Sequence, residues 1–397
     1  MTATERRATV GLAGISGLRL FGMFVILPVL ALYVERLPGG ASRVLLGTAL
    51  GIYGLTQAAL QVPFGWASDR WGRKPVVYFG LALFAAGSLV AALATDIAWI
   101  IVGRALQGGG AISAVLIAMA ADLTRDEVRT RAMAVIGVTI GTTFALSLVA
   151  GPVLTAWIGV PGIFLLTGAL AIASMGVVRH AIPELPRTAA RAAAPGSLGR
   201  ALRDGQLARL NYGVFALHAV LMALFVQVPF ALRDNGLAAD RHWLVYLPVL
   251  VVSVLLMLPF LRRADQPARS KRIFTGAVAT LLAAQVALAL SQHSLAALAF
   301  ALTLFFAAFN LLEATLPALI SKYAPEDIRG TAVGVYSCLQ FLGTFAGGVA
   351  GGWLAQHVGA ASVFVLGVVL TALWFAASAT MTVPPARYRS NYSMGET

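Results

Sequence analysis

Apolar residues dominate the chain in long runs that short polar stretches interrupt. A bilayer core of about 30 Å takes roughly 20 apolar residues per helix. Alternation with period two over about ten residues, which is typical of outer-membrane barrels, is absent from the sequence. The pattern therefore predicts an all-α membrane protein with twelve transmembrane helices. The expected spans lie near residues 10–34, 44–68, 75–95, 97–121, 132–157, 161–180, 210–232, 242–261, 273–291, 294–320, 330–356 and 361–382.

Composition supports a membrane protein. With 59% hydrophobic and 11% charged residues, the chain has too much apolar surface for one water-soluble core. The five His residues are scattered, and no nucleophile–base pair or metal motif is visible, so we do not expect an enzyme. The single Cys338 excludes a disulfide within one chain. We expect no cofactor.

Basic residues follow the loops of this predicted topology. A net charge of +13 would suggest nucleic acid in a soluble protein, but most Lys and Arg here lie in alternate loops, on the side of the two chain ends. The opposite side holds only Arg36, Arg43, Arg233 and Arg241. The positive-inside rule therefore predicts that both termini are cytoplasmic in a multi-pass protein of the bacterial inner membrane. We expect a monomer that binds no nucleic acid and whose basic inner loops contact anionic lipids.

One long polar interruption divides the chain into two groups of six spans. We expect an N-terminal six-helix bundle at 1–181, a cytoplasmic linker at 182–209, a C-terminal six-helix bundle at 210–383 and a cytoplasmic tail at 384–397. Within the linker, Ser197 as N-cap predicts a short basic helix on the inner leaflet. The alternative is a solvated tether.

The stretch GWASDRWGRK at 65–74 places charges between two apolar runs. Its first Gly would let a neighbouring helix approach, and its second can end a helix at positive φ. Asp69, where span two leaves the membrane, can pair with nearby cations, as can Asp122 at the end of span four. Pairs that form in one arrangement and break in another predict a conformational switch. The expected switch residues are Gly65, Asp69, Arg70, Gly72, Arg73, Lys74 and Asp122.

GWASDRWGRKPV resembles the signature loop of the major facilitator superfamily. RALQGGGA, at 104–111, resembles the Arg-x-x-Gln-Gly motif of span four in that superfamily. AGPVLTAW, from Ala150, resembles in part the Gly-Pro motif of its proton-driven antiporters but lacks the usual following Gly pair. Stretches such as LRLFGMFVILPVL and AFNLLEATLPALIS extend the resemblance along essentially the whole membrane part.

This resemblance implies a rocker-switch transporter with two six-helix bundles, in which spans 1, 4, 7 and 10 line a central cavity. It also implies that Asp69 and Arg73 latch the outward-open state against the start of span eleven, near Arg329 and Gly330. Similar chains can carry a soluble domain after the last span. The sequence ends soon after that span, and we expect no such domain here.

Four ionisable residues stand out well inside the expected spans, where a charge costs at least about 2.5 to 3.5 kcal/mol. Arg19, Arg104, Glu313 and His218 fall on spans 1, 4, 10 and 7, so all four are candidates for proton coupling. Glu313 is the first choice, because desolvation favours its neutral form and lets it load and release a proton. Alternatively, Glu313 permanently neutralises Arg19 or caps Asn310. His218 and Arg104 have structural hydrogen-bonding roles as their alternatives.

Polar residues on these spans are candidates for a substrate cavity. They are Tyr53, Gln57 and Gln61 at a spacing of four, Gln107 in the span-four motif, and Asn310 one turn from Glu313. The alternative is that glutamines in spans two and eleven only join helices by hydrogen bonds.

We expect the transporter to expel small lipophilic molecules in exchange for protons. A lipophilic ligand would suit Phe21, Phe24, Phe305 and Phe309 if they face inward, although such a run can equally pack against a neighbour. Another small solute, such as an organic anion, a sugar or a soft metal ion, is the alternative. His218 and Met222, spaced i, i+4, are the only hint of a metal, and we expect no resident metal site.

Overall fold

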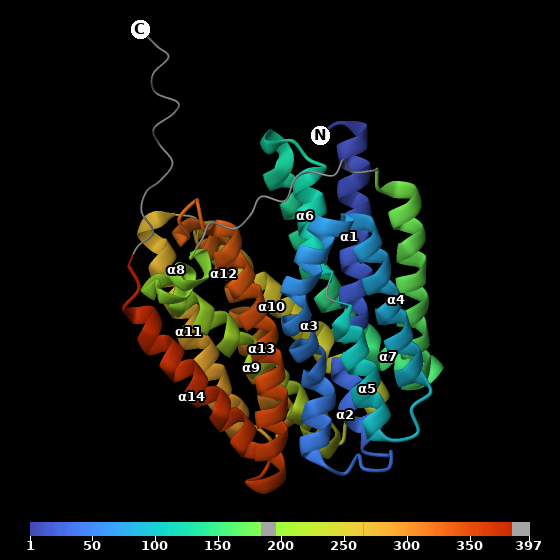
Figure 1. Cartoon of the computed structure of the whole chain (residues 1–397). Coiled ribbons are helices and arrows are strands. Elements are labelled where there is room, and N and C mark those ends of the chain that lie inside the picture. The colour runs from blue at the N-terminus through green and yellow to red at the C-terminus, as the bar shows by residue number, and fades with distance from the viewer. Residues whose placement is uncertain (111, 184–195, 265, 383–397) are drawn as a thin grey trace.

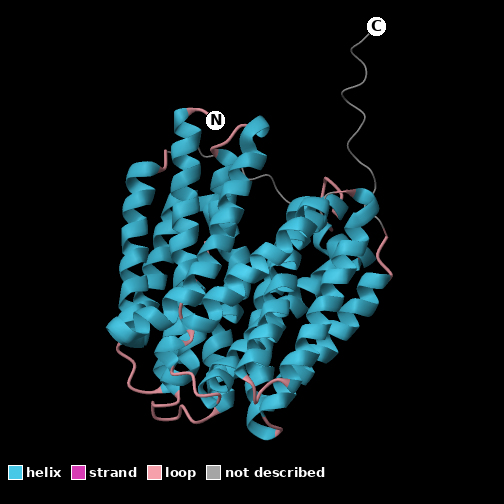
Figure 2. Ribbon diagram, turned by 180° about the vertical axis from the view of Figure 1, so that it is seen from behind, coloured by secondary structure: helices cyan, strands magenta, loops and turns pink. Residues whose placement is uncertain are grey.

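The computed structural model of the chain describes residues 1–110, 112–183, 196–264 and 266–382 (Figure 1). These residues form helices and loops, with no strand among them, and the loops gather at the two ends of the helices (Figure 2). In chain order the helices are α1 (Ala3–Phe24), α2 (Leu27–Val34), α3 (Arg43–Trp71), α4 (Arg73–Ala92), α5 (Ile97–Gly109), α6 (Ser113–Asp122), α7 (Asp126–Ala181), α8 (Ser197–Arg203), α9 (Gly205–Asp234), the 3-10 turn η1 (Ala239–Arg241), α10 (Trp243–Ala264), α11 (Pro267–Leu290), α12 (Leu295–Tyr323), α13 (Arg329–His357) and α14 (Ala360–Ala379).

Local sequence sets where several of these helices begin. The Thr2 hydroxyl accepts a hydrogen bond from the Glu5 amide at 3.2 Å, and the Glu5 carboxylate accepts one from the Thr2 amide, which is a capping box. Ser42 and Asp96 cap α3 and α5 in the same way, by accepting hydrogen bonds from first-turn amides. Gly72 separates α3 from α4 at a φ of 100°, a conformation that glycine adopts without a Cβ clash.

Eleven helical segments of the described chain are long and apolar enough to cross a bilayer, against the twelve expected. The difference lies in α7, whose 56 residues would extend about 84 Å at 1.5 Å per residue, far more than one bilayer core. Gly159, at a φ of 67°, interrupts the helical geometry of α7 between the expected spans 132–157 and 161–180. The all-helical membrane architecture predicted from the sequence is confirmed.

The helices form two groups that lie side by side, α1–α7 and α9–α14 (Figure 1). We call them the N-terminal and C-terminal halves. α7 ends at Ala181, where the first bundle was expected to end, and α9 begins at Gly205, shortly before the expected residue 210. Much of the expected linker, at 184–195, and the expected tail lie outside the described residues.

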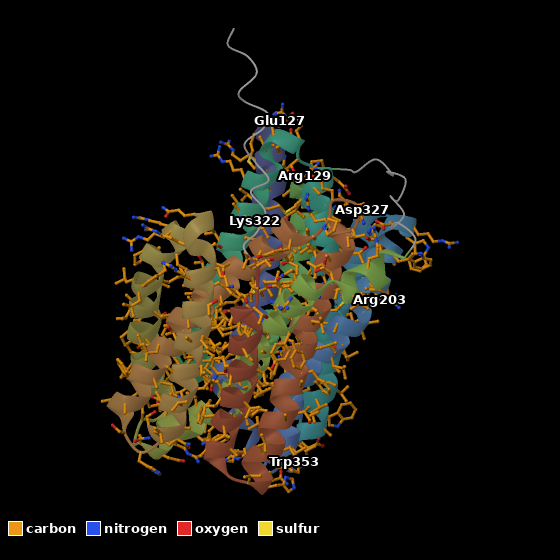
Figure 3. All side chains as sticks on the ribbon, turned by 90° about the vertical axis from the view of Figure 1, so that its left-hand side faces the viewer. Glu127, Arg129, Arg203, Lys322, Asp327 and Trp353 are labelled. Carbon is orange, nitrogen blue, oxygen red and sulfur yellow. The ribbon has the colours of Figure 1, made fainter. Side chains whose placement is uncertain are left out.

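The end of the molecule that holds the N-terminus also holds Glu127, Arg203, Lys322 and Asp327, whereas Trp353 lies at the opposite end (Figures 1 and 3). We call these the near end and the far end. Because α3 runs from the far end to the near end and α13 runs the other way, the two helices meet as an antiparallel pair between the halves.

The predicted linker helix is present as α8, at the near end. Gly196, at a φ of 72°, is its N-cap, so the expectation that Ser197 caps the helix is wrong. The Ser197 hydroxyl lies 3.2 Å from that of Thr331, and Arg200 pairs with Asp327. The Arg200 guanidinium holds the pKa of the Asp327 carboxyl below its ordinary value. These residues therefore dock on the start of α13 and are not a solvated tether.

The two halves are in close contact toward the far end. An ideal Cβ on Gly47 of α3 would lie only 2.0 Å from the carbonyl oxygen of Gly348 on α13, so the helix backbones touch where neither residue has a side chain. The Gln356 side-chain oxygen accepts hydrogen bonds from the Ser42 hydroxyl at 2.9 Å and the Val44 amide at 3.1 Å.

Toward the near end, the same two helices lack this close packing. Gly65 on α3 and both Gly330 and Gly334 on α13 have no neighbouring atom within 4 Å of an ideal Cβ. The backbone contact between α3 and α13 therefore lies in their far-end part.

Candidate functional site

A buried arginine lies at the centre of a polar cluster in the N-terminal half. Arg19, on α1, is only 3% exposed and donates hydrogen bonds to the Ser113 hydroxyl, to the Tyr53 hydroxyl at 3.0 Å and to the Gln57 side-chain oxygen. Its Nε has no hydrogen-bond partner among the described residues. All three acceptors are neutral, so no described carboxylate pairs with the guanidinium inside the membrane segment. The alternative that Glu313 neutralises Arg19 is wrong in this conformation.

The second buried arginine lies close to the first cluster. Arg104 is fully buried, donates to the Gln107 side-chain oxygen at 3.0 Å and lies 4.9 Å from the centroid of the Tyr53 ring. Gln107 in turn donates to the Ser88 hydroxyl at 2.8 Å. Tyr53 thus contacts both Arg19 and Arg104, and the N-terminal half holds two buried cations that neutral side chains surround.

The predicted cavity residues of the N-terminal half lie in this packed network. Tyr53, Gln57 and Gln107 have no exposed surface, and Gln61 is 6% exposed. The Gln57 amide nitrogen lies 3.3 Å from the Gln61 side-chain oxygen, so these residues join α1, α3 and α6 to one another. This burial favours the alternative in which the glutamines connect helices. Asn310 lies apart from them, with its amide nitrogen 3.4 Å from the Ser253 hydroxyl on α10.

The C-terminal half carries the ionisable pair. Glu313 on α12 and His218 on α9 approach with Oε2 and Nε2 3.6 Å apart. The Gln340 amide nitrogen, on α13, lies 2.9 Å from His218 Nε2 and 3.4 Å from Glu313 Oε1. The structure therefore brings two of the four predicted proton-coupling residues together, from α9 and α12, and joins them through Gln340 of α13. Arg19 and Arg104 lie in the other half.

The hydrogen bonds of this pair define the tautomer of His218. His218 Nδ1 lies 3.0 Å from the carbonyl oxygen of Val214, which can only accept, so the ring proton sits on Nδ1. Nε2 then accepts a hydrogen bond from the Gln340 amide nitrogen, and Glu313 Oε2 has no hydrogen-bond partner among the described residues. The Glu313 side chain is 34% exposed. The pair therefore contains one acceptor, Glu313 Oε2, that no described donor satisfies.

Aromatic rings pack against this pair and across the two halves. The Phe309 ring lies 6.0 Å from the His218 ring and 5.7 Å from that of Phe144 on α7, and Phe144 makes an edge contact with Phe24 on α1 at 4.9 Å. Phe305 stacks on Phe309 at 6.0 Å and has no exposed surface. In this conformation the predicted phenylalanines largely pack against one another, which favours the packing alternative.

The metal alternative finds little support in these residues. His218 uses Nδ1 on a backbone carbonyl, and Met222 is 1% exposed. No group of three or more His, Cys, Asp or Glu side chains that could hold a metal ion occurs within the ranges that the structure describes.

Charged residues of the predicted switch meet at the near end. Arg73 pairs with Asp69, four residues before it on the other side of Gly72. It also donates to the Ser68 hydroxyl at 2.7 Å and places Nε 3.2 Å from the Asp122 carboxylate on α6. Arg73 therefore contacts both carboxylates that the sequence placed in the switch. All of these residues belong to the N-terminal half.

Other residues of the same loop take different positions. Arg70 lies over the Trp66 ring, 5.5 Å from its centroid, and Lys74 is the second residue of α4. Gly72 has the positive φ that was expected. The expectation that Gly65 makes room for a packed neighbour is wrong in this conformation, because nothing lies within 4 Å of an ideal Cβ there.

The implied partner of this loop at the start of α13 has its own contacts. Arg329 Nη2 lies 4.0 Å from a Glu326 oxygen, and Gly330 faces open space. The arrangement that the resemblance implies for an outward-open state is not the arrangement of this structure.

An ion pair between Glu35 and Arg233 joins the two halves at the far end and was not predicted. Glu35, just after α2, pairs with Arg233 in the last turn of α9 and lies 3.6 Å from Arg43 of its own half. The Arg43 guanidinium carbon lies 3.3 Å from the centroid of the Phe230 ring on α9, and that of Arg233 lies 5.2 Å from it. In the sequence, Arg43 and Arg233 were identified only as residues of the outer loops. Nothing in it indicated that they meet.

Many apolar helices, two packed halves and ionisable groups within the spans define a multi-pass membrane transporter. The chain belongs to the Major Facilitator Superfamily, whose model matches residues 12–309 and 238–396.

Individual relatives agree with this assignment. The chain is 44% identical over 390 residues to the inner membrane transport protein YajR of Escherichia coli K12. The aligned region covers 97% of this chain and 85% of that protein. It is 27% identical over 352 residues to the multidrug resistance protein MdtH of Proteus mirabilis, covering 84% of each. A bacterial homologue of the human lysosomal transporter Spinster, solved in an inward-facing and occupied conformation, has the same fold, with a TM-score of 0.79, 14% identity, and coverage of 96% of this chain and 98% of that one.

Proposed function

We propose that the protein is a proton-coupled secondary transporter of the bacterial inner membrane, which expels small lipophilic molecules in exchange for protons. The observation that carries the proposal is the pair formed by Glu313 and His218. It places a carboxylate and an imidazole within 3.6 Å of each other on two helices of the C-terminal half.

Proton loading changes the interaction within this pair. In the unprotonated pair, Nε2 and Oε2 are both acceptors and do not attract each other. A proton between them creates a charge-assisted hydrogen bond, which is stronger than a neutral one. Because Gln340 contacts both groups, this change reaches α9, α12 and α13 together. The proton thereby alters the packing of three helices of one half.

Arg19 and Arg104 supply fixed positive charge on the other side of the transport path. When the halves rearrange, any approach of this charge toward Glu313 favours the ionised carboxylate and so the release of the proton. Neutral partners surround both arginines, so their charge is available for this role.

The transport cycle is a rocker switch between two six-helix bundles, 1–181 and 210–383. We infer twelve crossings, with α7 crossing twice around Gly159, and both termini in the cytoplasm. In that orientation the packed glycines Gly47 and Gly348 close the periplasmic end, and the conformation is open to the cytoplasm. The similarity to an inward-facing homologue supports this inference. Asp69, Arg73 and Asp122 form the cytoplasmic switch.

A lipophilic substrate is supported by the aromatic rings around Phe309 and by the multidrug resistance relative. A small organic anion is the second candidate. The specific observation in its favour is Arg19, a buried guanidinium whose described partners are all neutral. The two candidates differ in the charge that the site selects.

Purified protein in acid-loaded proteoliposomes, with a pH-sensitive dye inside, tests the function. We expect lipophilic cations or neutral lipophiles, added outside, to cause proton efflux. This substrate-dependent efflux should disappear when a protonophore has already collapsed the proton gradient. Proton efflux with organic anions alone would support the second candidate. A response to sugars alone, or transport that is independent of the proton gradient, would overturn the proposal.

A further inference from the structure

A groove lies between α11 and α14, on the outer side of the C-terminal half, where the two helices run side by side (Figure 1). Its volume is about 510 Å³. The residues that line it are Lys271, Arg272, Thr275, Gly276, Ala279, Phe375 and Ala379. They extend from the first turns of α11 to its middle and along the last turns of α14, so the groove opens at the near end of two membrane-spanning helices.

The part of the groove at the near end is cationic. Lys271 and Arg272 are adjacent in the first turns of α11, and neither forms an ion pair with a side chain that the structure describes. Two other basic residues at this end, Arg73 and Arg200, do have carboxylate partners, Asp122 and Asp327. The Thr275 hydroxyl, one turn further along α11, also has no hydrogen-bond partner among the described residues.

Farther from the near end, the groove is lined by apolar residues. Gly276 has no atom within 4 Å of an ideal Cβ, so it leaves the groove open at that level. Ala279 continues the floor along α11, and the 37% exposed Phe375 ring forms the opposite side on α14. The groove therefore changes from cationic to apolar along the direction in which the helices enter the membrane.

We propose that this groove binds an anionic phospholipid. Its phosphate lies between Lys271 and Arg272, and an acyl chain runs along Gly276, Ala279 and Phe375. Anionic headgroups are recognised by basic pockets between transmembrane helices on the cytoplasmic side. A free anion would use the cations but not the apolar wall, and a zwitterionic lipid would gain less from two adjacent cations. The bound lipid holds α11 against α14, away from Glu313 and His218.

Native mass spectrometry of the full chain with phosphatidylglycerol tests this site. We expect one phosphatidylglycerol to bind more tightly than phosphatidylcholine. Lys271→Gln with Arg272→Gln should weaken that binding about tenfold, because two cations next to the headgroup are lost. The matched control is Arg262→Gln with Arg263→Gln, which removes the same charge from exposed residues of α10 at the same end. This control should change the affinity less than twofold.

A second variant tests the apolar part. Gly276→Leu fills the groove, introduces a better helix former and leaves both cations in place, so the protein should fold and bind phosphatidylglycerol several-fold more weakly. Equal losses in the Lys271/Arg272 variant and the Arg262/Arg263 control would reduce the effect to general surface charge and overturn the proposal. So would binding of inorganic phosphate as tight as that of the lipid, or an unaltered affinity in Gly276→Leu.

Discussion

The Glu35 carboxylate, just after α2, pairs with the Arg233 guanidinium in the last turn of α9 and so joins the two halves at the far end. Arg233 has a second carboxylate, that of Asp234, at 3.2 Å, but this one belongs to its own helix. One partner of Arg233 therefore spans the interface and the other does not. This difference allows the contribution of the contact between the halves to be measured separately from the charge on Arg233.

We predict that Glu35→Gln shifts the protein toward a state that is open at the far end. Exposed ion pairs contribute about 0.2–1 kcal/mol, so the population should change by up to about fivefold. Spin labels at Leu93 and Leu290, exposed residues at the far ends of α4 and α11, report the distance between the halves. Asp234→Asn is the control and should leave the distance distribution unchanged. If both variants behave alike, the ion pair between Glu35 and Arg233 has no role in closing the far end.

A methyl group between α3 and α13 should wedge the halves apart. Gly47→Ala places a Cβ 2.0 Å from the Gly348 carbonyl oxygen, and such overpacking costs about 1–3 kcal/mol in this closed arrangement. The same labels should then report a longer far-end distance. Gly334→Ala on α13 adds a methyl group where an ideal Cβ has no neighbour, and should leave the distance as it is. An unchanged distance in Gly47→Ala would show that the helices do not pack this closely.

Removal of the Asp69 charge should stop the switch without unfolding the protein. Arg73 keeps its contacts with Asp122 and Ser68, so Asp69→Asn leaves the near end ordered while it removes one carboxylate of the switch. We predict loss of transport and a population shifted toward the inward-open state. Distances between labels at the near ends of α3 and α13 measure this shift, and full transport with unchanged distances would contradict the prediction. Asp240→Asn, an exposed carboxylate near η1, is the charge-matched control.

Much of the fold is readable from the sequence because each span depends only on its own length and polarity. Contacts between residues close in sequence could also be predicted, such as that of Arg73 with Asp69, which lie four positions apart on either side of Gly72. The sequence treated the stretch around Gly159 as a simple break between two spans. The structure has its break at the same place, because Gly159, at a φ of 67°, interrupts the helical geometry there, and helix continues on both sides without a separate loop.

The candidate site was only half predictable, since its contacts join residues far apart in the chain. His218 was a candidate from its place on span seven, but Gln340, which contacts it, lies 122 positions later and had no signal beyond being polar within a span. Glu35 and Arg233 are 198 positions apart. Residue type and span could identify Glu313 and Arg19, but whether they pair with each other depends on helix rotation, which the sequence does not specify.

The central claim, that Glu313 carries the coupled proton, is tested most directly by Glu313→Gln in proteoliposomes. Glutamine resembles the protonated acid in shape but cannot release a proton. We predict that uphill transport driven by a pH gradient falls at least about tenfold, which corresponds to about 1.4 kcal/mol, while substrate still binds and exchanges at equilibrium. Glu127→Gln, at the exposed start of α7, controls for the loss of one carboxylate and should transport normally. A Glu313→Gln protein that still concentrates substrate against its gradient would contradict the account.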